Sequence, residues 1–237
     1  MKLYALTHRG HKREINEDRC LTKKIGDETW IMAVADGMGG HRSGEIAADI
    51  VKTTLNEIDF IPADKEKYLL FLMDEAHNRI KEFAKKNPAS NGMGTTATMA
   101  LIHAGEAWWA HVGDSRLYRI RNRILGQATC DQNMAWFLVE EGQITEEEAL
   151  THPLRNLLDQ SLGQGEYPCD PETGIFALAK GDQLTLMTDG IHGELTPKAI
   201  SAILTEQTDI ETKVKKLTQA ALDAGGNDNI TVVMAEI

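Results

Sequence analysis

Residues Thr29-Trp-Ile-Met-Ala-Val-Ala-Asp36-Gly37 form an apolar run that ends in an acid and a glycine. An apolar run of this length is typical of a strand that is buried on both faces. The same ending recurs where Leu184-Thr-Leu-Met-Thr188 precedes Asp189-Gly190. In the reverse order, Asp228 and Asn229 precede the run Ile230-Thr-Val-Val-Met234. Acids therefore mark the ends of several predicted strands.

The hydrophobic period switches along the chain between the alternation of strands and the spacing of helices. Strands are predicted over residues 4–7, 20–22, 29–35, 95–102, 107–112, 116–120, 176–179, 183–188 and 230–235. Helices are predicted over residues 45–58, 65–86, 197–207 and 210–224. Because strands and helices do not alternate strictly, a doubly wound parallel sheet is not expected. The pattern favours an α+β layered sandwich in which helix pairs cover antiparallel sheets.

The least regular part of the sequence runs from about residue 132 to residue 167. It carries a short amphipathic helix over residues 135–141 and a second one near Glu146. Long irregular inserts in compact domains are usually functional or mobile, so we interpret this stretch as a surface flap. No internal repeat or flexible linker interrupts the rest, and residues 1–237 are expected to form a single catalytic domain with that insert.

Composition excludes several classes of protein. Hydrophobic residues make up 42% of the 237 residues and charged residues 26%, as in ordinary globular proteins. The 25 basic and 36 acidic residues give a net charge of −11, which repels nucleic acid and anionic membranes. The three cysteines are isolated, so neither a zinc knuckle nor a disulfide framework is expected. No apolar run approaches the ~20 residues of a membrane span, and the expected location is the cytoplasm.

The acids at the strand ends are expected to lie close together. In an antiparallel sheet, the end of one strand lies beside the start of its neighbour. Asp114, in Gly113-Asp-Ser115, is interpreted as part of a hairpin between two predicted strands. One sheet edge would then collect the four strand-flanking acids, with two further candidates from the N-terminal region: Asp36, Asp114, Asp189 and Asp228, with Glu17 and Asp18.

Carboxylates crowded on one edge repel one another unless a cation lies between them. Hard oxygen ligands suit Mg²⁺ or Mn²⁺ rather than zinc. The glycine after Asp36 lets the backbone approach closely, so that the Gly37 carbonyl is a further candidate ligand. The alternative is that Asp-Gly marks ordinary hairpin turns and that Glu17 and Asp18 belong to a solvated loop. Periodicity leaves both interpretations open.

A set of short motifs follows in order through the whole chain: Gly10-x-x-Arg13-x-x-Asn16-Glu-Asp18, Val34-Ala-Asp36-Gly-Met-Gly-Gly-His41 with Gly44-Glu45, Gly94-Thr-Thr96, Val112-Gly-Asp114-Ser-Arg116-x-Tyr118, Thr188-Asp-Gly190 and Asp228-Asn-Ile-Thr231. By these motifs the chain resembles the metal-dependent serine/threonine protein phosphatases of the type 2C (PPM) family, in their short bacterial form. The resemblance implies a four-layer α/β/β/α sandwich, in agreement with the layered pattern above.

The resemblance also implies a site with two tightly bound Mn²⁺ or Mg²⁺ ions. Asp36 would bridge both ions, Asp189 and Asp228 would complete one of them, and the Gly37 carbonyl would serve the other. Asp114, together with Asp189, matches the position that holds a third, weaker ion in bacterial members.

Three more residues receive roles from the resemblance. Glu17 and Asp18 would act in the outer shell of the metals through water molecules. Arg13 matches the arginine that grips the substrate phosphate, which makes Arg13 and Asp36 the expected catalytic residues. A guanidinium offers the planar, bidentate donor geometry that phosphate favours.

The sequence departs from the family pattern at several places. Met38 stands where some eukaryotic members carry a histidine proposed as general acid, and His8 replaces an acid ahead of the first glycine. Gln132 and Asn133 replace His-Ser after Asp131, and His192 stands where an acid, serine or threonine often follows. None of these positions is an expected direct metal ligand, so activity is expected to persist while substrate choice stays open.

The remaining histidines receive simpler interpretations. His41, in Gly-Gly-His, either reaches the leaving group or stabilises its loop, and the structural role is favoured. His8, His11 and His192 have no metal-ligand spacing and are interpreted as loop residues.

The function expected is hydrolysis of phosphoserine and phosphothreonine in proteins by a metal-activated water, which reverses a serine/threonine kinase in signalling. The expected partners are phosphorylated proteins and a cognate kinase, with no nucleic acid and no membrane, and the chain is expected to be a monomer. One rival is a catalytically dead regulatory module of the same fold, against which the complete set Asp36, Asp189 and Asp228 argues. The other is a metal-dependent nucleotide phosphodiesterase, against which the acidic charge argues.

Overall fold

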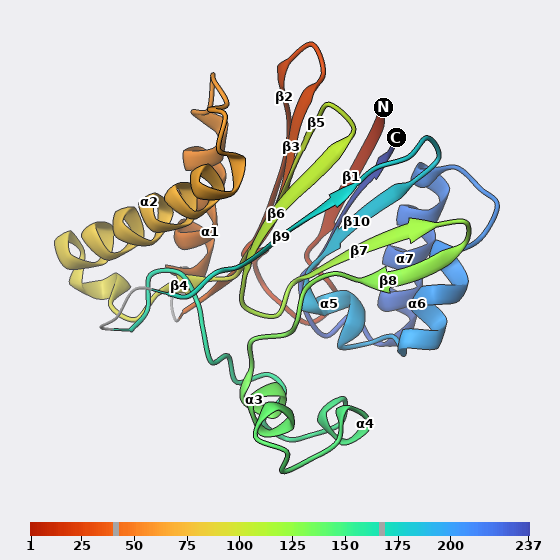
Figure 1. The fold of residues 1–237 in the computed structure, drawn as a ribbon. Helices are drawn as coiled ribbons and strands as arrows, with labels where there is room; N and C mark the ends of the chain where they lie inside the picture. The colour runs from red at the N-terminus through yellow and green to blue at the C-terminus, as the bar shows by residue number, and fades with distance from the viewer. Residues whose placement is uncertain (40–42, 166–168) are drawn as a thin grey trace.

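Two antiparallel sheets stack face to face between layers of helices in the computed structural model, which describes residues 1–39, 43–165 and 169–237 (Figure 1). Within these residues, one sheet has five strands in the order β1-β11-β10-β7-β8. Its strands are β1 (Lys2–His8), β7 (Arg116–Arg121), β8 (Ile124–Gln127), β10 (Gln183–Met187) and β11 (Ile230–Glu236). The two chain ends therefore meet at neighbouring strands, since β1 pairs with β11.

The second sheet, counted over the same described residues, has six strands with the path β2-β3-β5-β6-β9. Its strands are β2 (Asp18–Gly26), β3 (Thr29–Met38), β5 (Ala97–His103), β6 (Glu106–Val112) and β9 (Glu172–Ala177), with β4 (Gly94–Thr95) paired to the end of β3. The α+β sandwich expected from the sequence is confirmed.

Helices cover the outer face of each sheet (Figure 1). The six-stranded sheet carries α1 (Ser43–Asn56) and α2 (Lys65–Lys86), which a short 3₁₀ turn, η1 (Pro88–Ser90), follows. The five-stranded sheet carries α6 (Pro197–Leu204) and α7 (Ile210–Ala224), and α5 (Asp189–His192) directly follows β10. The helices α3 (Met134–Glu140) and α4 (Glu146–Ala149) lie away from both sheets, in the segment predicted as a flap (Figure 1).

The position of β3 explains why its sequence is apolar without alternation. Ile31 and Ala33 point toward α1 and α2, whereas Met32 and Val34 point into the layer between the two sheets. The layer between the sheets also contains Val233 of β11, from the opposite sheet. Both faces of β3 are thus buried, and its run of apolar residues ends where the strand emerges at Asp36.

Polar side chains define where several helices begin. Asp64 accepts a hydrogen bond from the Lys67 backbone at the start of α2, and Thr196 and Asp209 cap α6 and α7 in the same way. None of the helices in the described ranges combines the length and apolar character that a bilayer crossing needs.

Several predicted boundaries were wrong for identifiable reasons. The predicted strand over residues 95–102 is broken at Thr96, and the strand predicted to begin at residue 176 begins at Glu172. The hairpin strand β8 was not predicted, because its turn uses Asn122 and Arg123 with positive φ rather than a glycine. His192 lies in α5 and His8 ends β1, so neither is a loop residue.

The interpretation of Gly113–Ser115 as a hairpin was also wrong. β6 belongs to the six-stranded sheet and β7 to the five-stranded sheet, so this turn crosses between the sheets. The acids therefore do not share the edge of one sheet. They gather at one end of the sandwich, to which both sheets contribute.

Candidate metal and phosphate site

Asp18 and Asp36 lie directly opposite each other in the β2–β3 pair. Asp18 is 1% exposed, and its Oδ2 accepts a hydrogen bond of 2.8 Å from Thr188 Oγ1, which follows β10 in the other sheet. Like charges on directly opposed residues destabilise a strand pair. The end of this strand pair therefore places two acids where their repulsion, when both are ionised, destabilises the pairing of the strands.

The backbone of Asp36 is held from the next strand. Its N–H donates to Thr96 Oγ1 at 3.0 Å, and its carbonyl accepts from Thr96 N at 2.9 Å and from Thr95 Oγ1 at 2.9 Å. The Thr96 hydroxyl also lies 2.8 Å from Ser115 Oγ, in the turn that carries Asp114. The break in the predicted strand at Thr96 thus serves to connect Asp36 with the Asp114 turn.

Asp189 and Asp228 flank the ends of neighbouring strands, as the sequence predicts. The Thr188 N–H donates to Thr231 O at 3.1 Å, and the Thr231 N–H donates to Thr188 Oγ1 at 3.0 Å. A Cβ on Gly190 would lie 1.9 Å from Asn229 O, so only glycine lets the two segments approach this closely. The glycine after Asp189 is therefore a packing requirement of the site.

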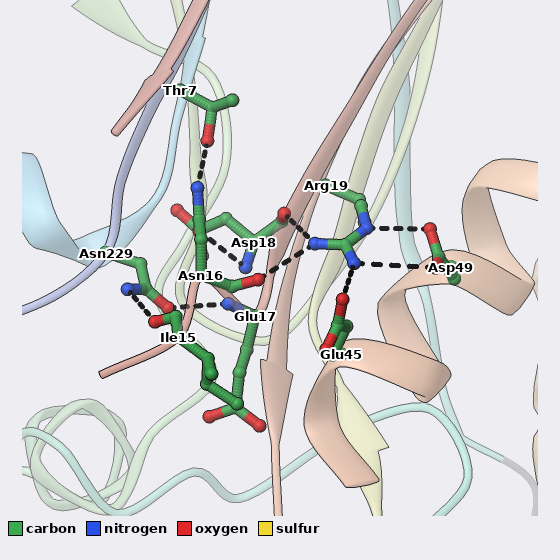
Figure 2. A network of polar contacts seen from close by, with 9 residues as sticks. All are labelled: Thr7, Ile15, Asn16, Glu17, Asp18, Arg19, Glu45, Asp49 and Asn229. Carbon is green, nitrogen blue, oxygen red and sulfur yellow. Dashed lines mark hydrogen bonds and ion pairs between the residues drawn. The ribbon is translucent and has the colours of Figure 1, made fainter. Parts of the chain in front are cut away.

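A network of polar contacts positions the loop before β2 (Figure 2). Asn229 Nδ2 donates to Arg9 O and Ile15 O, both at 2.9 Å, while its Oδ1 accepts from Glu17 N at 2.8 Å. Arg19 donates to Glu45 Oε1 at 2.6 Å. These contacts fix the loop to β11 on one side and to α1 on the other.

Glu17 lies beside the end of β3 and the start of α1. A Cβ on Gly44 would lie 2.7 Å from Glu17 Oε1, and a Cβ on Gly37 would lie 2.1 Å from Gly44 O. The Glu17 carboxylate projects away from the polar network of its own loop (Figure 2). The two glycines thus bring the start of α1 and the Gly37 backbone close to this carboxylate.

Arg13, the predicted phosphate ligand, lies beside the acids. Its Nη2 is 2.6 Å from Asp228 Oδ2, and its side chain is 50% exposed. Burial opposes its charge, but the hydrogen bond and charge of Asp228, with Asp189 and Asp36, raise the pKa of Arg13 overall. A half-exposed guanidinium in this position is available to an anionic ligand from solvent.

Six acids therefore meet at this end of the sandwich, and we call them the carboxylate edge: Glu17, Asp18, Asp36, Asp114, Asp189 and Asp228. Burial and the neighbouring acids raise the pKa of Asp36 well above its ordinary value. Burial and the charge of Asp189 also raise the pKa of Asp114 well above its ordinary value. At neutral pH the edge resists full ionisation as long as no cation is present.

Three further carboxyls show the same effect with smaller shifts. Burial, opposed by the hydroxyls of Thr231 and Thr188, raises the pKa of Asp18 to about 7. Burial and the charge of Asp228 raise the pKa of Asp189 to about 6, although Asp36 lowers it. Burial also raises the pKa of Glu17. The acids at this edge therefore interact with one another and with few compensating groups.

The residues present fit a site for divalent cations. Among the residues that the structure describes, three buried carboxylate oxygens in the edge have no hydrogen-bond partner: Glu17 Oε1, Asp18 Oδ1 and Asp189 Oδ1. Ionised carboxylates only accept, so a cation or its bound water would satisfy such atoms. The donors are all hard oxygens, which is the chemistry of Mg²⁺ or Mn²⁺ sites.

The acids lie near one another, but their side chains are not arranged as a closed metal site. Over residues 1–39, 43–165 and 169–237, no three His, Cys, Asp or Glu side chains gather closely enough to form a ready-made metal site. Within the edge, Asp228 is engaged by Arg13. His41, for which a loop or leaving-group role was considered, lies outside the described residues.

A second group of charges lies behind Asp114, at the base of the flap. Arg116 and Asp131 are both buried and form a bidentate ion pair, with Nε–Oδ1 at 2.8 Å and Nη2–Oδ2 at 2.7 Å. Burial alone raises the pKa of Asp131, but the hydrogen bonds and charge of Arg116 outweigh it and lower that pKa overall. This acid is therefore fully compensated.

A cleft of about 830 Å³ runs from the carboxylate edge to the flap. Its lining includes Asp114 and Asp189 of the carboxylate edge, Trp136 of α3, Glu146 of α4 and Arg155. The cleft gives a solvent-connected path from the flap to two of the acids.

Sequence reasoning did not identify the supporting residues of the site. Thr96, Thr188 and Asn229 stand within motifs that the sequence shows, but their hydrogen-bonding roles depend on segments far apart in the chain. Their positions directly beside the acids were the available signal.

An antiparallel α/β/β/α sandwich with a carboxylate edge and an arginine beside it has the features expected of a metal-dependent phosphatase. The sequence model of the protein phosphatase 2C family matches residues 7–224. The chain belongs to this family, and the family and enzyme class predicted from the motifs are confirmed.

Individual relatives resemble the chain over its full length. It is 34% identical to protein phosphatase PhpP of Streptococcus pneumoniae, over 100% of this chain and 98% of that protein. It is 32% identical to the serine/threonine phosphatase stp of Listeria monocytogenes, over 97% of this chain and 93% of that protein.

Solved structures show the same fold. The S. agalactiae serine/threonine phosphatase superposes with a TM-score of 0.90 at 34% identity, covering 98% of each chain. The catalytic domain of the serine/threonine protein phosphatase PstP in complex with two manganese ions superposes with a TM-score of 0.87 at 31% identity, covering 99% of this chain and 97% of that one.

Proposed function

We propose that this chain hydrolyses phosphoserine and phosphothreonine in proteins, with two tightly bound Mn²⁺ or Mg²⁺ ions at the carboxylate edge. The observation that carries the proposal is the set of buried and half-buried acids beside an accessible arginine. Several of these acids have raised pKa values, and three of their oxygens have no partner within the described residues. The two manganese ions in the PstP structure support the choice of metal. The family membership supports the choice of phosphate esters.

The acids of the edge receive distinct roles in this proposal. Asp36 would serve both ions, Asp189 and Asp228 would complete one, and the Gly37 carbonyl would serve the other. Asp114, with Asp189, would hold a third, weaker ion. When bound, the ions supply an activated water and offset the charge of the phosphoryl oxygens.

The outer residues of the edge hold these ligands in place. Thr96 fixes the backbone of Asp36, and Thr188 holds Asp18 across the gap between the sheets. Glu17 and Asp18 would act through water molecules. Because several of the acids have raised pKa values without metal, their ionisation on metal binding would release protons.

Arg13 would bind and orient the phosphate group of the substrate. Its fork of donors matches two phosphoryl oxygens, and a charge-assisted bidentate contact also orients phosphorus for in-line attack. Arg13 now donates to Asp228 Oδ2. A bound phosphate would share this guanidinium with Asp228 or take it over.

The substrates would be phosphorylated proteins, and a serine/threonine kinase would supply them. We further propose that residues 1–237 act as one catalytic domain and as a monomer, with the flap at about residues 132–167 beside the cleft.

Hydrolysis of a phosphopeptide and of a nucleotide diester, each with added Mn²⁺ or with EDTA, tests the proposal. We expect Mn²⁺-dependent release of phosphate from the phosphopeptide only, with loss in EDTA and in Asp36→Asn. Preferred hydrolysis of the diester would favour a phosphodiesterase. Binding of the phosphopeptide without hydrolysis would favour a regulatory module.

A further inference from the structure

Two departures from the family pattern meet the same turn. Gln132, at the start of the flap, accepts a hydrogen bond at its Oε1 from Gly113 N at 2.9 Å. His192, at the end of α5, lies with its Nε2 at 3.1 Å from Asp114 O, and because a carbonyl only accepts, this nitrogen donates. Side chains from two separate elements thus hold the Gly113 N–H and the Asp114 carbonyl of the turn that carries Asp114.

The contact from the flap side is reinforced by the backbone. The Gln132 N–H donates to Gly113 O at 2.7 Å, so Gln132 and Gly113 exchange two hydrogen bonds. On its other side, the Gln132 carbonyl accepts from Asp159 N at 2.9 Å, in the segment that returns from the flap. Gln132 therefore joins the Asp114 turn to both ends of the flap described here.

The contact from the helix side links two acids of the carboxylate edge. His192 follows Asp189 by three residues in the single turn of α5, so both side chains project from the same face of that turn. The hydrogen bond from His192 ends on the backbone of Asp114. The distance between the Asp189 and Asp114 backbones is therefore constrained by one imidazole ring.

The side of the turn that faces Thr96, here called its inner side, is closely packed. Gly113 has φ of +106°, and a Cβ there would lie 2.6 Å from Thr96 Cγ2. The inner side is therefore packed against Thr96, while the side chains of Gln132 and His192 hold the Gly113 N–H and the Asp114 carbonyl.

We propose that Gln132 and His192 are positioning residues that clamp the Gly113-Asp114 turn between the flap and α5. The clamp holds Asp114 at the distance from Asp189 that a weakly bound cation shared by the two acids would require. It also transmits the position of the flap to Asp114. The clamp stands on the geometry alone, whereas its effect on the weak cation rests on the proposed function.

Matched variants separate the clamp from ordinary packing. Gln132→Met and His192→Phe keep the size of the side chain and remove the acceptor or the donor. Gln132→Glu and His192→Gln retain an acceptor or a donor at a similar reach. If the two side chains hold the turn, the first two variants should change its hydrogen bonding and the second two should preserve it.

Nuclear magnetic resonance of the full, metal-free chain reads the clamp directly. We expect amide exchange at Gly113 to rise roughly three- to tenfold in Gln132→Met, as loss of one hydrogen bond predicts, and to stay near wild type in Gln132→Glu. We expect the Asp114 carbonyl resonance to move in His192→Phe and to return in His192→Gln. Wild-type exchange in Gln132→Met, or an unmoved resonance in His192→Phe, would overturn the clamp.

Titration of the same variants with Mn²⁺ reads the consequence for Asp114. We expect the Mn²⁺ concentration for half-maximal phosphopeptide hydrolysis to rise roughly three- to tenfold in Gln132→Met and His192→Phe, with two tight ions retained by metal analysis. An unchanged requirement for Mn²⁺ would overturn the link to the weak cation. If wild type hydrolyses no phosphopeptide, the proposed function fails, while the resonance measurements still decide the clamp.

Discussion

Buried acids occur in two neighbouring regions of this molecule, with opposite electrostatic outcomes. In the flap base, Asp131 receives both hydrogen bonds of a guanidinium, and its pKa is lowered. In the carboxylate edge, Asp114 lies two residues before Arg116 in the chain, yet its pKa is raised well above the ordinary value. The difference shows that a counter-charge within the chain favours the ionised form of a buried acid. Without that counter-charge, burial favours the protonated form, and a bound cation would favour ionisation.

The largest effect is expected on kcat, from substitution of the acids proposed as metal ligands in the carboxylate edge. Asp36→Asn should lower kcat for phosphopeptide hydrolysis at least about a thousandfold, because metal ions supply several kcal/mol of transition-state stabilisation. Asp189→Asn should behave in the same way. Steady-state kinetics with saturating Mn²⁺ measures this.

Removal of a crowded acid also relieves repulsion in the metal-free protein. Metal-free Asp36→Asn should therefore melt no lower than the metal-free wild type. Turnover at the wild-type rate in either variant would mean that these acids are not the metal ligands.

The opposite effect on stability is expected at the buried Arg116–Asp131 ion pair. Asp131→Asn leaves Arg116 buried without its counter-charge, and should reduce the free energy of unfolding by about 3–5 kcal/mol. Chemical denaturation with and without Mn²⁺ should show a similar loss in both states. A loss below about 1 kcal/mol would remove the distinction between the two regions.

Arg13→Ala should have a smaller effect, confined to the binding and orientation of the substrate. Loss of one charge-assisted contact should lower kcat/KM by about 1.5–3 kcal/mol, or roughly ten- to a hundredfold, chiefly through KM. Metal content should not fall, because Asp228 loses only a competing partner. Arg13→Lys should recover little, since it lacks the bidentate geometry. Unaltered kcat/KM together with unaltered inhibition by phosphate would exclude Arg13 from the site.

The pH dependence of stability separates the two regions without any substrate. The pKa of Asp189 is about 6 in the folded chain and about 4 in an unfolded one, so the folded state holds more protons between these values. Stability of the metal-free protein should therefore fall as pH rises from about 4 to about 7. Asp131 acts in the other direction: its contribution is present above the unfolded pKa and is lost as pH falls through its lowered folded pKa.

Thermal melts of the metal-free protein between pH 5 and pH 8 check this sign. Over this pH range the contribution of Asp189 is roughly 1.4 kcal/mol, or roughly 3–6 °C for a chain of this size. The decline with pH should be shallower in Asp189→Asn and should disappear with saturating Mn²⁺. A melting temperature that rises with pH in the metal-free wild type would contradict the raised pKa values.

The sequence predicted the layers and the acids because both depend on local signals. The apolar run of β3 and the helical spacing of α1 and α2 predicted the sandwich, and an acid stood at the end or start of β3, β10 and β11. The turn at Asp114 was misjudged because residue spacing does not reveal that β6 and β7 belong to different sheets.

The supporting contacts were beyond sequence reasoning for a related reason. Thr188 reaches Asp18 over 170 positions, and His192 reaches Asp114 over 78 positions. Such pairs depend on how the two sheets stack, which no periodicity encodes. The motifs contain Asp18, Asp114 and Thr188, and the fold shows how each is held.

Calorimetric titration of the metal-free protein with Mn²⁺ at pH 6.5, repeated in buffers of different ionisation enthalpy, tests the central claim most directly. If the carboxylate edge is a cation site kept partly protonated by its own crowding, two tight ions should bind per chain with net release of protons. Asp36→Asn should lose tight binding, and Asp131→Asn should retain it wherever the variant is folded. Absence of tight binding, or binding that releases no protons and persists in Asp36→Asn, would contradict the account.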